Sequence, residues 1–352
     1  MHLAVLTSGG DAPGMNAAIR TIAVVGIDRG HRVSGVHRGY QGLLEGEITE
    51  LRLADIEGIT HQGGTILGSS RSAEFPTPAG QARAKARLRE HGIDGLLVIG
   101  GNGSLTGAHL LGLDQSVRVV GLPASIDNDI GHSGLSIGVD TAVNTIVEAC
   151  DRISDTARAH RRAVIVEVMG RRCGFLAMRA GLAAEADAIL YGESNLGEDE
   201  VVATLREVLR KVFAPGGYKK RALIVKSEGV AIPSARLLSR LADHLADDAP
   251  GVEIRETVLG HVVRGGNPSA LDRVIAQRLA YAAVMACEAG AHDIMLAWEA
   301  PGAPGKETMD PSVRAVPLTE VLAETAKLLD GTSVILRKRM QMLEQVKHLL
   351  AL

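Results

Sequence analysis

Short aliphatic runs that end in glycine or small polar residues recur along this chain and constrain its fold most. Clear cases are "LAVLTSGGD" (3–11), "GLLVIGGNGS" (95–104) and "VVGLPASIDND" (119–129). Continuous aliphatic runs are typical of strands buried on both faces, as in parallel sheets. Helical stretches lie between them, for example residues 15–30 and 79–92. This alternation predicts an α/β fold with doubly wound sheets.

The same pattern continues in the second half of the chain and predicts a second α/β domain from about residue 140. Strands are expected in "AVIVEVMG" (163–170) and "RALIVKSEG" (221–229), and helices over 197–213 and 237–247. No low-complexity linker separates the two halves, so we expect the chain to cross between the domains more than once. The pattern of residues 335–352 predicts a helix, which we expect to dock on its own domain; the alternative is a helix that binds a partner.

Composition excludes several classes of protein. The 352 residues are 46% hydrophobic and 22% charged, as in ordinary soluble globular proteins. A net charge of −3 and an aromatic content of 2% argue against nucleic-acid and anionic-membrane partners. The three cysteines are widely spaced, which suggests a reducing cytoplasm. The N-terminus does not resemble a secretory signal, and no apolar stretch is long enough to span a bilayer. No H-E-x-x-H or Cys-His spacing predicts a zinc site.

Three glycine-rich loops should meet at the carboxyl edge of one sheet, where ligands of open α/β folds bind. They are "SGGDAPGMN" (8–16), "QGGTILGSSR" (62–71) and "GGNGS" (100–104). Glycine lets backbone N–H groups approach a phosphate, and a helix N-terminus favours an anion. Neither a Walker A motif nor G-x-G-x-x-G is present, and each loop alone could be a tight turn. Together they favour a phosphate-rich ligand.

Two carboxylates, Asp127 and Asp129, follow the strand of "PASIDNDI" (123–130). Like charges so close together repel and are costly to desolvate. Asp127 could accept the proton of an attacking hydroxyl, while Asp129 could help to hold Mg²⁺ on a donor phosphate. The alternative is an Asx-rich turn, which would predict no surrounding basic cluster.

Basic residues gather at "HRR" (160–162), "VMGRRCG" (168–174) and "EIRETVLGHVVRGGNP" (253–268). Arginine holds phosphate in a fork and stays charged, so these groups suit a second phosphorylated ligand. Each basic residue could instead have an ordinary surface or core role. The candidates are Arg162, Arg171, Arg255, His261 and Arg264. Arg71, at the end of the loop 62–71, could neutralise phosphate oxygens of the first ligand.

Five motifs, in order from Val5 to Gly266, resemble the bacterial 6-phosphofructokinases. They are "VLTSGGDAPGMNAAIR", "GGTILGSSR", "PASIDNDI", "VEVMGRRCG" and "TVLGHVVRGG". The resemblance implies a cytoplasmic, glycolytic kinase that transfers phosphate from ATP, with Mg²⁺, to the 1-hydroxyl of fructose 6-phosphate. It also implies a homotetramer of subunits with two three-layer α/β/α domains and an active site in the cleft between them. The expected nucleotide domain is 1–138 plus about 256–305, and the sugar-phosphate domain about 139–255 plus 306–352.

The resemblance also implies a role for each matching residue. Asp127 would be the general base beside Ser125, and Arg71 and Arg171 would stabilise the transferring phosphoryl group. Arg162 and Arg255 would come from a neighbouring subunit. The sugar-phosphate site would comprise Ser125, Asp127, Arg162, Met169, Gly170, Arg171, Glu228, Arg255, His261 and Arg264. The nucleotide site would comprise Gly10, Tyr40, Arg71, Ser72, Gly101, Asn102, Gly103, Ser104 and Gly107, and Asn102 with Asp129 would face the metal.

Three positions depart from the family pattern. Asn102 replaces the aspartate of the family's "GGDGS", which should weaken Mg²⁺ binding. Pyrophosphate-dependent relatives tend to carry Asp at the position of Gly103 and Lys at that of Ala124; the small residues here favour ATP. At the effector site, Arg20 and Lys219–Lys220 match the family, but Val24 and Ser154 stand where arginines are expected.

Three functions therefore stand at this stage. The leading one is an ATP-dependent 6-phosphofructokinase that yields fructose 1,6-bisphosphate and ADP. The close alternative uses pyrophosphate, or acts on another phosphoketose such as sedoheptulose 7-phosphate. The third, prompted by Asn102, is a non-catalytic sensor of sugar phosphates or nucleotides.

Overall fold

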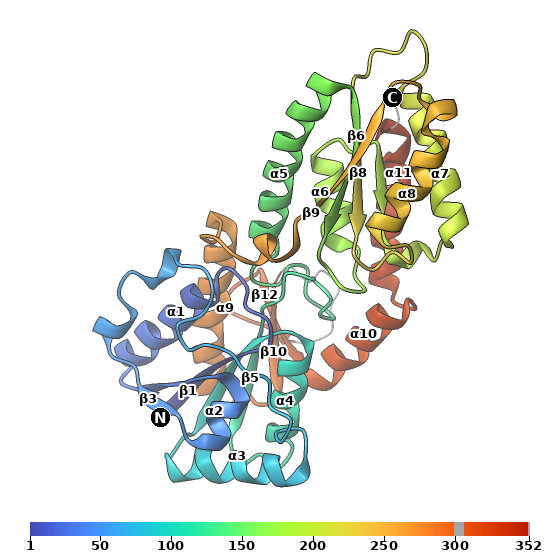
Figure 1. The fold of residues 1–352 in the computed structure, drawn as a ribbon. Coiled ribbons are helices and arrows are strands. Elements are labelled where there is room, and N and C mark those ends of the chain that lie inside the picture. The colour runs from blue at the N-terminus through green and yellow to red at the C-terminus, as the bar shows by residue number, and fades with distance from the viewer. Residues whose placement is uncertain (299–305, 351–352) are drawn as a thin grey trace. The chain divides into compact units, whose positions relative to one another are not determined.

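The computed structural model describes residues 1–298 and 306–350 and divides the chain into two compact units (Figure 1). Unit 1 contains Met1–Thr141 and Arg264–Leu328, and unit 2 contains Ala142–Val263 and Leu329–Leu352. The chain therefore passes between the units three times. Each unit has its own sheet covered by helices, which confirms the predicted two-domain α/β class.

Unit 1 is built on an eight-stranded sheet in the order β11-β12-β10-β5-β4-β1-β2-β3. Its five central strands are parallel, while β3 and β12 run antiparallel to their inner neighbours. The register places Ser8 opposite Gly100, and Gly100 opposite Pro123, so three strands end level. The strands are β1 (His2–Ser8), β2 (Arg32–Val36), β3 (Ile48–Glu50), β4 (Gly95–Gly100), β5 (Arg118–Pro123), β10 (Ile294–Trp298), β11 (Lys306–Glu307) and β12 (Val313–Pro317).

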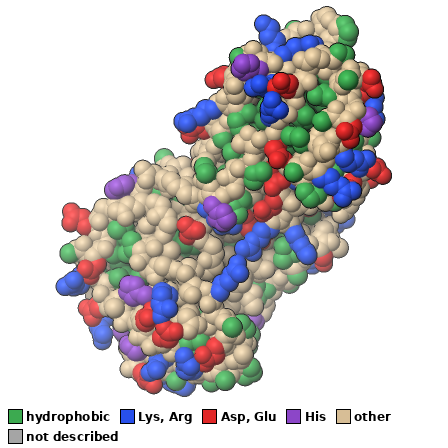
Figure 2. All heavy atoms as spheres, in the orientation of Figure 1, with side chains coloured by type: hydrophobic (Ala, Val, Ile, Leu, Met, Phe, Trp, Pro, Cys, Tyr) green, Lys and Arg blue, Asp and Glu red, His purple; other side chains and the backbone are tan. Residues whose placement is uncertain are grey.

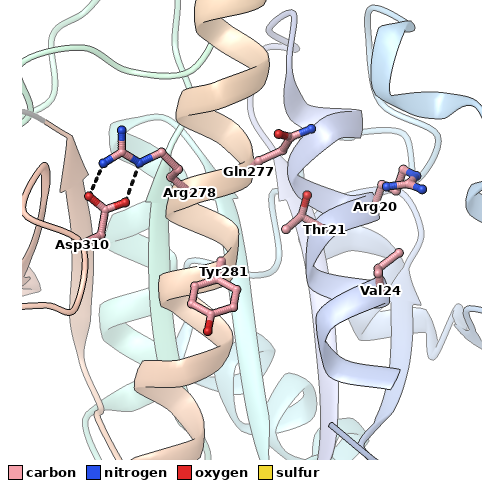
Figure 3. Close-up of a pocket in the computed structure, with 7 residues that line it drawn as sticks. All are labelled: Arg20, Thr21, Val24, Gln277, Arg278, Tyr281 and Asp310. Carbon is pink, nitrogen blue, oxygen red and sulfur yellow. Dashed lines mark hydrogen bonds and ion pairs between the residues drawn. The ribbon is translucent and has the colours of Figure 1, made fainter. Parts of the chain in front are cut away.

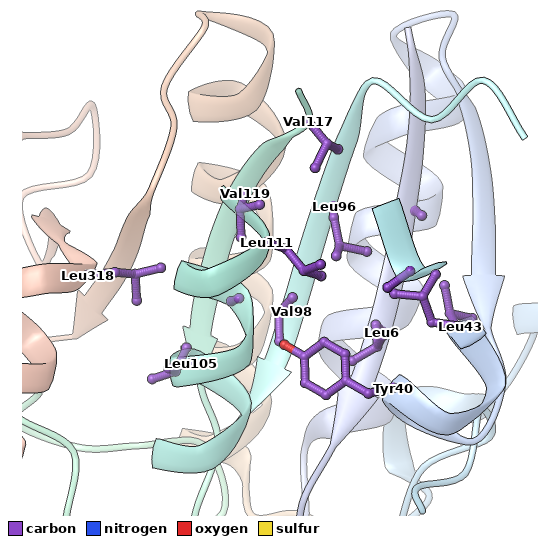
Figure 4. Close-up of a cluster of buried hydrophobic side chains, with 14 of the residues drawn as sticks. Leu6, Tyr40, Leu43, Leu96, Val98, Leu105, Leu111, Val117, Val119 and Leu318 are labelled. Atoms are coloured by element: carbon purple, nitrogen blue, oxygen red, sulfur yellow. The ribbon is translucent and has the colours of Figure 1, made fainter. Parts of the chain in front are cut away.

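Helices cover both faces of this sheet. α1 (Met15–Asp28) and α9 (Ala270–Glu288) lie side by side on one face. The opposite face carries α2 (Gly39–Glu45), α3 (Pro78–Glu90) and α4 (Asn102–Gly112). Figure 4 shows Tyr40 and Leu43 of α2, with Leu105 and Leu111 of α4, packed over the aliphatic side chains of the strands. The remaining elements of this unit are α10 (Leu318–Asp330), η1 (Leu53–Ile56) and η2 (Ile59–His61).

Unit 2 is built on a four-stranded parallel sheet in the order β7-β8-β6-β9. The amphipathic helices α7 and α8 pack against each other and bury their leucines and valines on this sheet. α6 and α11 pack together through a smaller cluster around Met178 and Leu343. The elements are β6 (Arg162–Val168), β7 (Ala188–Leu190), β8 (Ala222–Ser227), β9 (Glu253–Val258), α5 (Val139–His160), α6 (Phe175–Ala183), α7 (Glu198–Val212), α8 (Ser234–Asp248), α11 (Val334–Leu350), η3 (Gly192–Ser194) and η4 (Gly260–Arg264).

The observed units differ from the expected domain boundaries at two segments. Residues 306–328 belong to unit 1, because β12 pairs with β10 and α10 packs into the core of that unit. Residues 256–263 belong to unit 2, because β9 pairs with β6. Residues 299–305, which the sequence analysis assigned to the first domain, lie outside the described residues.

The surface carries charges of both signs. On the face drawn in Figure 2, Lys and Arg side chains are interspersed with Asp and Glu side chains. Such mixing leaves no single-sign field over this face that would attract a polyanion. None of the described helices is both long and apolar enough to cross a membrane.

Candidate active site

Glycines shape the carboxyl edge of the sheet in unit 1, where β1, β4 and β5 end level. Gly9 has a φ of +85°, a conformation that glycine adopts without strain. A Cβ on Gly100 would lie 2.5 Å from both the carbonyl oxygen of Ser8 and the Oγ of Ser104. No side chain fits there, so glycine allows β4 to turn directly into α4. The predicted convergence of glycine-rich strand ends is therefore present.

The third glycine-rich loop, residues 62–71, is fixed to the same edge by a buried asparagine of α1. The Asn16 Nδ2 donates to the carbonyl of Gln62 at 3.2 Å, and its Oδ1 accepts the Ile66 N–H at 2.8 Å. These bonds hold the loop that ends at Arg71, whose side chain is exposed. Asn16 lies within the motif "SGGDAPGMN", but no local pattern in the sequence marks it as the residue that fixes this loop.

Asp127 is a buried carboxylate in the turn that follows β5, four residues after the strand ends. An arginine compensates its charge within unit 1, since Arg264 Nη2 lies 3.7 Å from Asp127 Oδ1. The Arg264 Nη1 also donates to the carbonyl of Asp11 at 3.4 Å. A Cβ on Gly10 would lie only 2.8 Å from that Nη1, so the glycine makes room for the guanidinium. The turn with Asp127 and Asp129, the acidic turn, thus has the nearby cation that a simple Asx turn would lack.

Asn128 holds the turn that orients Asp127 and Asp129. It is fully buried and has a φ of +51°, a conformation that asparagine tolerates better than most residues. Its Nδ2 donates to the Gly134 carbonyl at 3.0 Å, and its Oδ1 accepts the Ser136 N–H at 3.0 Å. The amide thus closes the loop between Asn128 and Ser136. The signal in the sequence was the asparagine between two aspartates.

Ser125 links the acidic turn to the start of α4. Its Oγ accepts the Asp127 N–H at 3.3 Å and donates to Asp129 Oδ1 at 3.5 Å. The position of a Cβ on Gly101 would be 3.9 Å from the same Oγ. Gly101 immediately precedes Asn102, the first residue of α4, so the start of this helix lies near the turn that carries Asp129. The metal site predicted at Asn102 and Asp129 stays a prediction.

The start of α4 suits an anion and one divalent ion. A helix N-terminus leaves its first N–H groups without intrahelical acceptors. Gly103 is exposed, and a Cβ there would meet nothing within 4 Å, so the space beside this turn is open. Mg²⁺ is commonly held by one or two carboxylates and by substrate phosphates. Asp129 and Asn102 fit that requirement, although no group of three or more His, Cys, Asp or Glu side chains is present among the described residues.

Tyr40 packs beneath α4. Only 5% of it is exposed, its ring stacks on Phe75 at 3.9 Å, and its hydroxyl donates to the Ser104 carbonyl at 2.6 Å. Burial raises the pKa of this phenol far above its usual value. A Cβ on Gly107 would lie 2.8 Å from the tyrosine ring. Both residues shape the start of α4; their contact with a nucleotide stays a prediction. The nearby Ser72 Oγ accepts the Phe75 N–H at 3.2 Å.

In unit 2, the Glu228 carboxylate holds the loop that follows β6 through hydrogen bonds to its backbone. Its Oε1 accepts the N–H of Gly170 at 3.1 Å and that of Arg171 at 2.5 Å. Gly170 and Arg171 have φ values of +140° and +51°, which turn the loop sharply. A Cβ on Gly229 would lie 2.3 Å from the Arg171 carbonyl oxygen, so only glycine fits there. The structure thus brings together Met169, Gly170, Arg171 and Glu228, as predicted for one site.

The other basic candidates of unit 2 lie elsewhere on the sheet. Arg162 and Arg255 both contact Glu253 Oε2, at 2.9 Å in each case. Arg162 begins β6, whereas Met169 follows its end, so about 23 Å of extended strand separates them. His261 is exposed in η4. One copy of the chain therefore does not bring Arg162 to its own Met169 loop.

A further cavity of about 420 Å³ lies between α1 and α9 (Figure 3). Arg278 and Asp310 form a bidentate ion pair at one side of the cavity, while Arg20 and Val24 line it from α1. In unit 2, Lys219 Nζ contacts the buried Asp187 at 2.7 Å. The effector role of Arg20 and of Lys219–Lys220 stays a prediction.

Anion-binding strand ends around a buried carboxylate are typical of α/β enzymes that act on phosphorylated substrates. Residues 2–287 match the phosphofructokinase family, and the chain belongs to that family. This confirms the resemblance noted in the motifs.

Individual relatives agree with this assignment. The ATP-dependent 6-phosphofructokinase of Thermotoga neapolitana is 47% identical over 84% of this chain and 89% of its own length. The enzyme of the same name from Clostridium novyi is 44% identical over 80% of this chain and 84% of its own. Phosphofructokinase of Pichia pastoris in the T-state superposes with a TM-score of 0.87 at 31% identity. It matches 98% of this chain, which spans 39% of that longer one. A pyrophosphate-dependent phosphofructokinase from Marinobacter aquaeolei shares the fold. It superposes with a TM-score of 0.77 at 20% identity over 97% of this chain and 91% of its own.

Proposed function

We propose that this protein is an ATP-dependent 6-phosphofructokinase. It transfers the γ-phosphoryl group of ATP to the 1-hydroxyl of fructose 6-phosphate and releases fructose 1,6-bisphosphate and ADP. The observation that carries the proposal is the buried Asp127 carboxylate, with Arg264 at 3.7 Å, among glycine-rich strand ends. Identity of 42–47% to curated enzymes of that name supports the same reaction.

Asp127 is the general base in this proposal. Its carboxylate takes the proton of the 1-hydroxyl as that oxygen bonds to the γ-phosphorus. The bond from the phosphorus to the β,γ-bridging oxygen breaks, and its electron pair leaves with ADP. The hydrogen bonds of the Asn128 amide and of the Ser125 hydroxyl hold the turn and so keep the Asp127 carboxylate oriented for this transfer.

Positive groups supply the remaining stabilisation, because phosphoryl transfer depends on positioning and on charge. Arg71 and Arg171 stabilise the oxygens of the migrating group, and the start of α4 holds donor phosphates through its backbone N–H groups. Asn102 and Asp129 would hold Mg²⁺, which would neutralise phosphate charge when bound. Unit 2 binds the sugar phosphate through the Met169–Arg171 loop and Glu228.

The active form is a homo-oligomer, for which we propose a tetramer. Arg162 and Arg255 lie toward the beginning of their strands, far along the sheet from the Met169 loop. They complete the sugar-phosphate site of a neighbouring copy. Measuring specific activity against protein concentration tests this: activity should fall as the oligomer dissociates, and a fully active monomer would contradict it. Three free cysteines, two of them buried, support a reducing cytoplasm as the compartment.

ATP is the proposed donor. The exposed Gly103 leaves open space at the start of α4, where an aspartate would instead project a negative charge. Pyrophosphate-dependent transfer, or a different phosphoketose acceptor, is the second candidate, because Asn102 is typical of neither the ATP-dependent nor the pyrophosphate-dependent pattern.

A donor and acceptor matrix tests the proposal. Purified protein is assayed with Mg²⁺, with ATP or pyrophosphate as donor, and with fructose 6-phosphate or sedoheptulose 7-phosphate as acceptor. We expect the highest kcat/KM with ATP and fructose 6-phosphate. Higher efficiency with pyrophosphate would move the protein to the second candidate. Ligand-induced thermal stabilisation without product from any pair would indicate a sensor instead.

A further inference from the structure

A lysine is completely buried in the sheet of unit 2. Lys226, in β8, is 1% exposed and is the largest fully buried side chain in the described part of the chain. Lysine is almost never fully buried unless it is paired. Its Nζ donates to Glu167 Oε2 at 2.9 Å and to the Ser227 carbonyl at 3.4 Å. The charge is therefore compensated by one specific carboxylate.

That carboxylate lies directly across the sheet. Glu167 of β6 is opposite Lys226 in the parallel register, and its Oε2 also accepts the hydroxyl of Ser234 at the start of α8. Burial would raise the pKa of Glu167, but the hydrogen bonds from Ser234 and Lys226 outweigh it and lower that pKa. Three elements, β6, β8 and α8, therefore meet at one ion pair.

The ion pair lies just beneath the loops that carry the sugar-phosphate candidates. Glu167 precedes Met169 by two residues, and Lys226 precedes Glu228 by two residues. Between the pair and the loops, the Glu228 N–H donates to the Val168 carbonyl at 2.9 Å. The pair therefore joins the two strand ends from which Glu228 and the Gly170–Arg171 turn extend.

We propose that Lys226 is a positioning residue for sugar-phosphate binding; the inference rests on the proposed function of this loop. A buried ion pair is seldom needed for stability, because apolar side chains of similar volume are often equally stabilising. A charged hydrogen bond is directional, whereas apolar contact is not, so it fixes the relative position of two strand ends. Lys226 thereby sets how Glu228 meets the N–H groups of Gly170 and Arg171.

The test variant is Lys226→Met, which is one heavy atom shorter than lysine, keeps the unbranched shape of the side chain and removes its charge. We expect the KM for fructose 6-phosphate to rise between about 10-fold and about 100-fold, as a slightly misplaced binding group produces. The KM for ATP should change less than about 2-fold, since the donor residues lie in unit 1. The dissociation constant for fructose 6-phosphate, measured by calorimetry, should rise with its KM.

A double variant separates positioning from folding. Lys226→Met with Glu167→Gln leaves no unpaired buried charge, so it should recover the thermal stability that the single variant loses. If Lys226 acts through geometry, the raised KM persists in the double variant. Recovery of KM together with stability, or a single variant with a KM within about 2-fold of the original, would overturn the inference.

The matched control lies at the other end of α8. Arg206 Nε contacts the buried Asp248 at 2.6 Å, so Arg206→Met also removes a cation from a buried carboxylate of unit 2. It should lower stability and leave the KM for fructose 6-phosphate unchanged; an equal rise in KM would make the Lys226 effect unspecific. If the unmodified protein turned over no donor, the proposed function would fail, while the calorimetric comparison would still decide the role of Lys226.

Discussion

Replacing Asp127 by asparagine removes the proposed base with the smallest change of shape. The carboxylate lies 3.7 Å from the Arg264 guanidinium, and the two side chains are 6% and 11% exposed. At that distance the attraction is ~4.5 kcal/mol for an effective dielectric constant near 20. Desolvation of both charges offsets much of it. We therefore expect Asp127→Asn to lower the free energy of unfolding by only about 1–3 kcal/mol.

The loss of activity should be larger. A positioned general base contributes about 10²–10⁴-fold to a rate, which corresponds to about 2.7–5.5 kcal/mol of activation free energy. Since asparagine cannot take the proton of the sugar hydroxyl, kcat should fall by that factor. The dissociation constant for fructose 6-phosphate should change little, because the amide retains the shape of the carboxylate.

Three measurements decide this prediction: ADP release with ATP and fructose 6-phosphate, calorimetric binding of fructose 6-phosphate, and urea denaturation. Asp129→Asn is the matched control, since it also removes one carboxylate from the same turn. It should raise the Mg²⁺ concentration needed for activity, with a much smaller loss at saturating Mg²⁺. An Asp127→Asn variant that is folded and keeps more than a tenth of the original kcat would refute the role of Asp127 as the base.

Three further predictions concern unit 1. Asn102→Asp should lower the Mg²⁺ concentration for half-maximal activity; an unchanged or higher requirement would show that this position does not face the metal. Tyr40→Phe removes a hydroxyl bonded to the Ser104 carbonyl, so unfolding free energy should fall by about 1 kcal/mol and the KM for ATP should rise only severalfold. A rise above about 100-fold, more than one lost neutral hydrogen bond provides, would indicate direct contact with the nucleotide. Burial holds the pKa of His2 below 6.5, so the unfolded chain takes up its proton first and stability should fall as the pH drops below about 6.5. In urea denaturation at pH 8.0 and 5.5, His2→Gln should reduce that fall, and an equal fall in both proteins would contradict the assignment.

The fold and the acidic turn could be predicted because their signals are local. Aliphatic runs that end in glycine mark the ends of β1 and β4, and glycine is required there by contacts within a few residues or across neighbouring strands. Asp127 was predicted because two aspartates so close together need compensation. The cation that provides it, Arg264, was assigned only to the sugar phosphate, since nothing in the sequence fixes which carboxylate a distant arginine meets.

The features that could not be predicted depend on pairing between distant segments. Lys226 reads as one polar residue at the end of an aliphatic run, and its partner Glu167 is defined only by the register of β6 and β8. The unit of residues 306–328 differs from the expected domain for the same reason, because β12 is a short antiparallel strand whose partner, β10, no local pattern specifies. Register is set by the whole sheet rather than by one segment.

Glu228 and Asp127, to which the proposed function gives different roles, differ in their contacts. Glu228 accepts two backbone N–H groups, at 2.5 and 3.1 Å, which a ligand could displace only by breaking the loop that presents Arg171. Asp127 has its arginine at 3.7 Å, longer than a charged hydrogen bond. A base must approach the hydroxyl that it deprotonates to within about 3 Å. The contacts therefore favour Asp127 for proton transfer and Glu228 for shaping the sugar-phosphate loop.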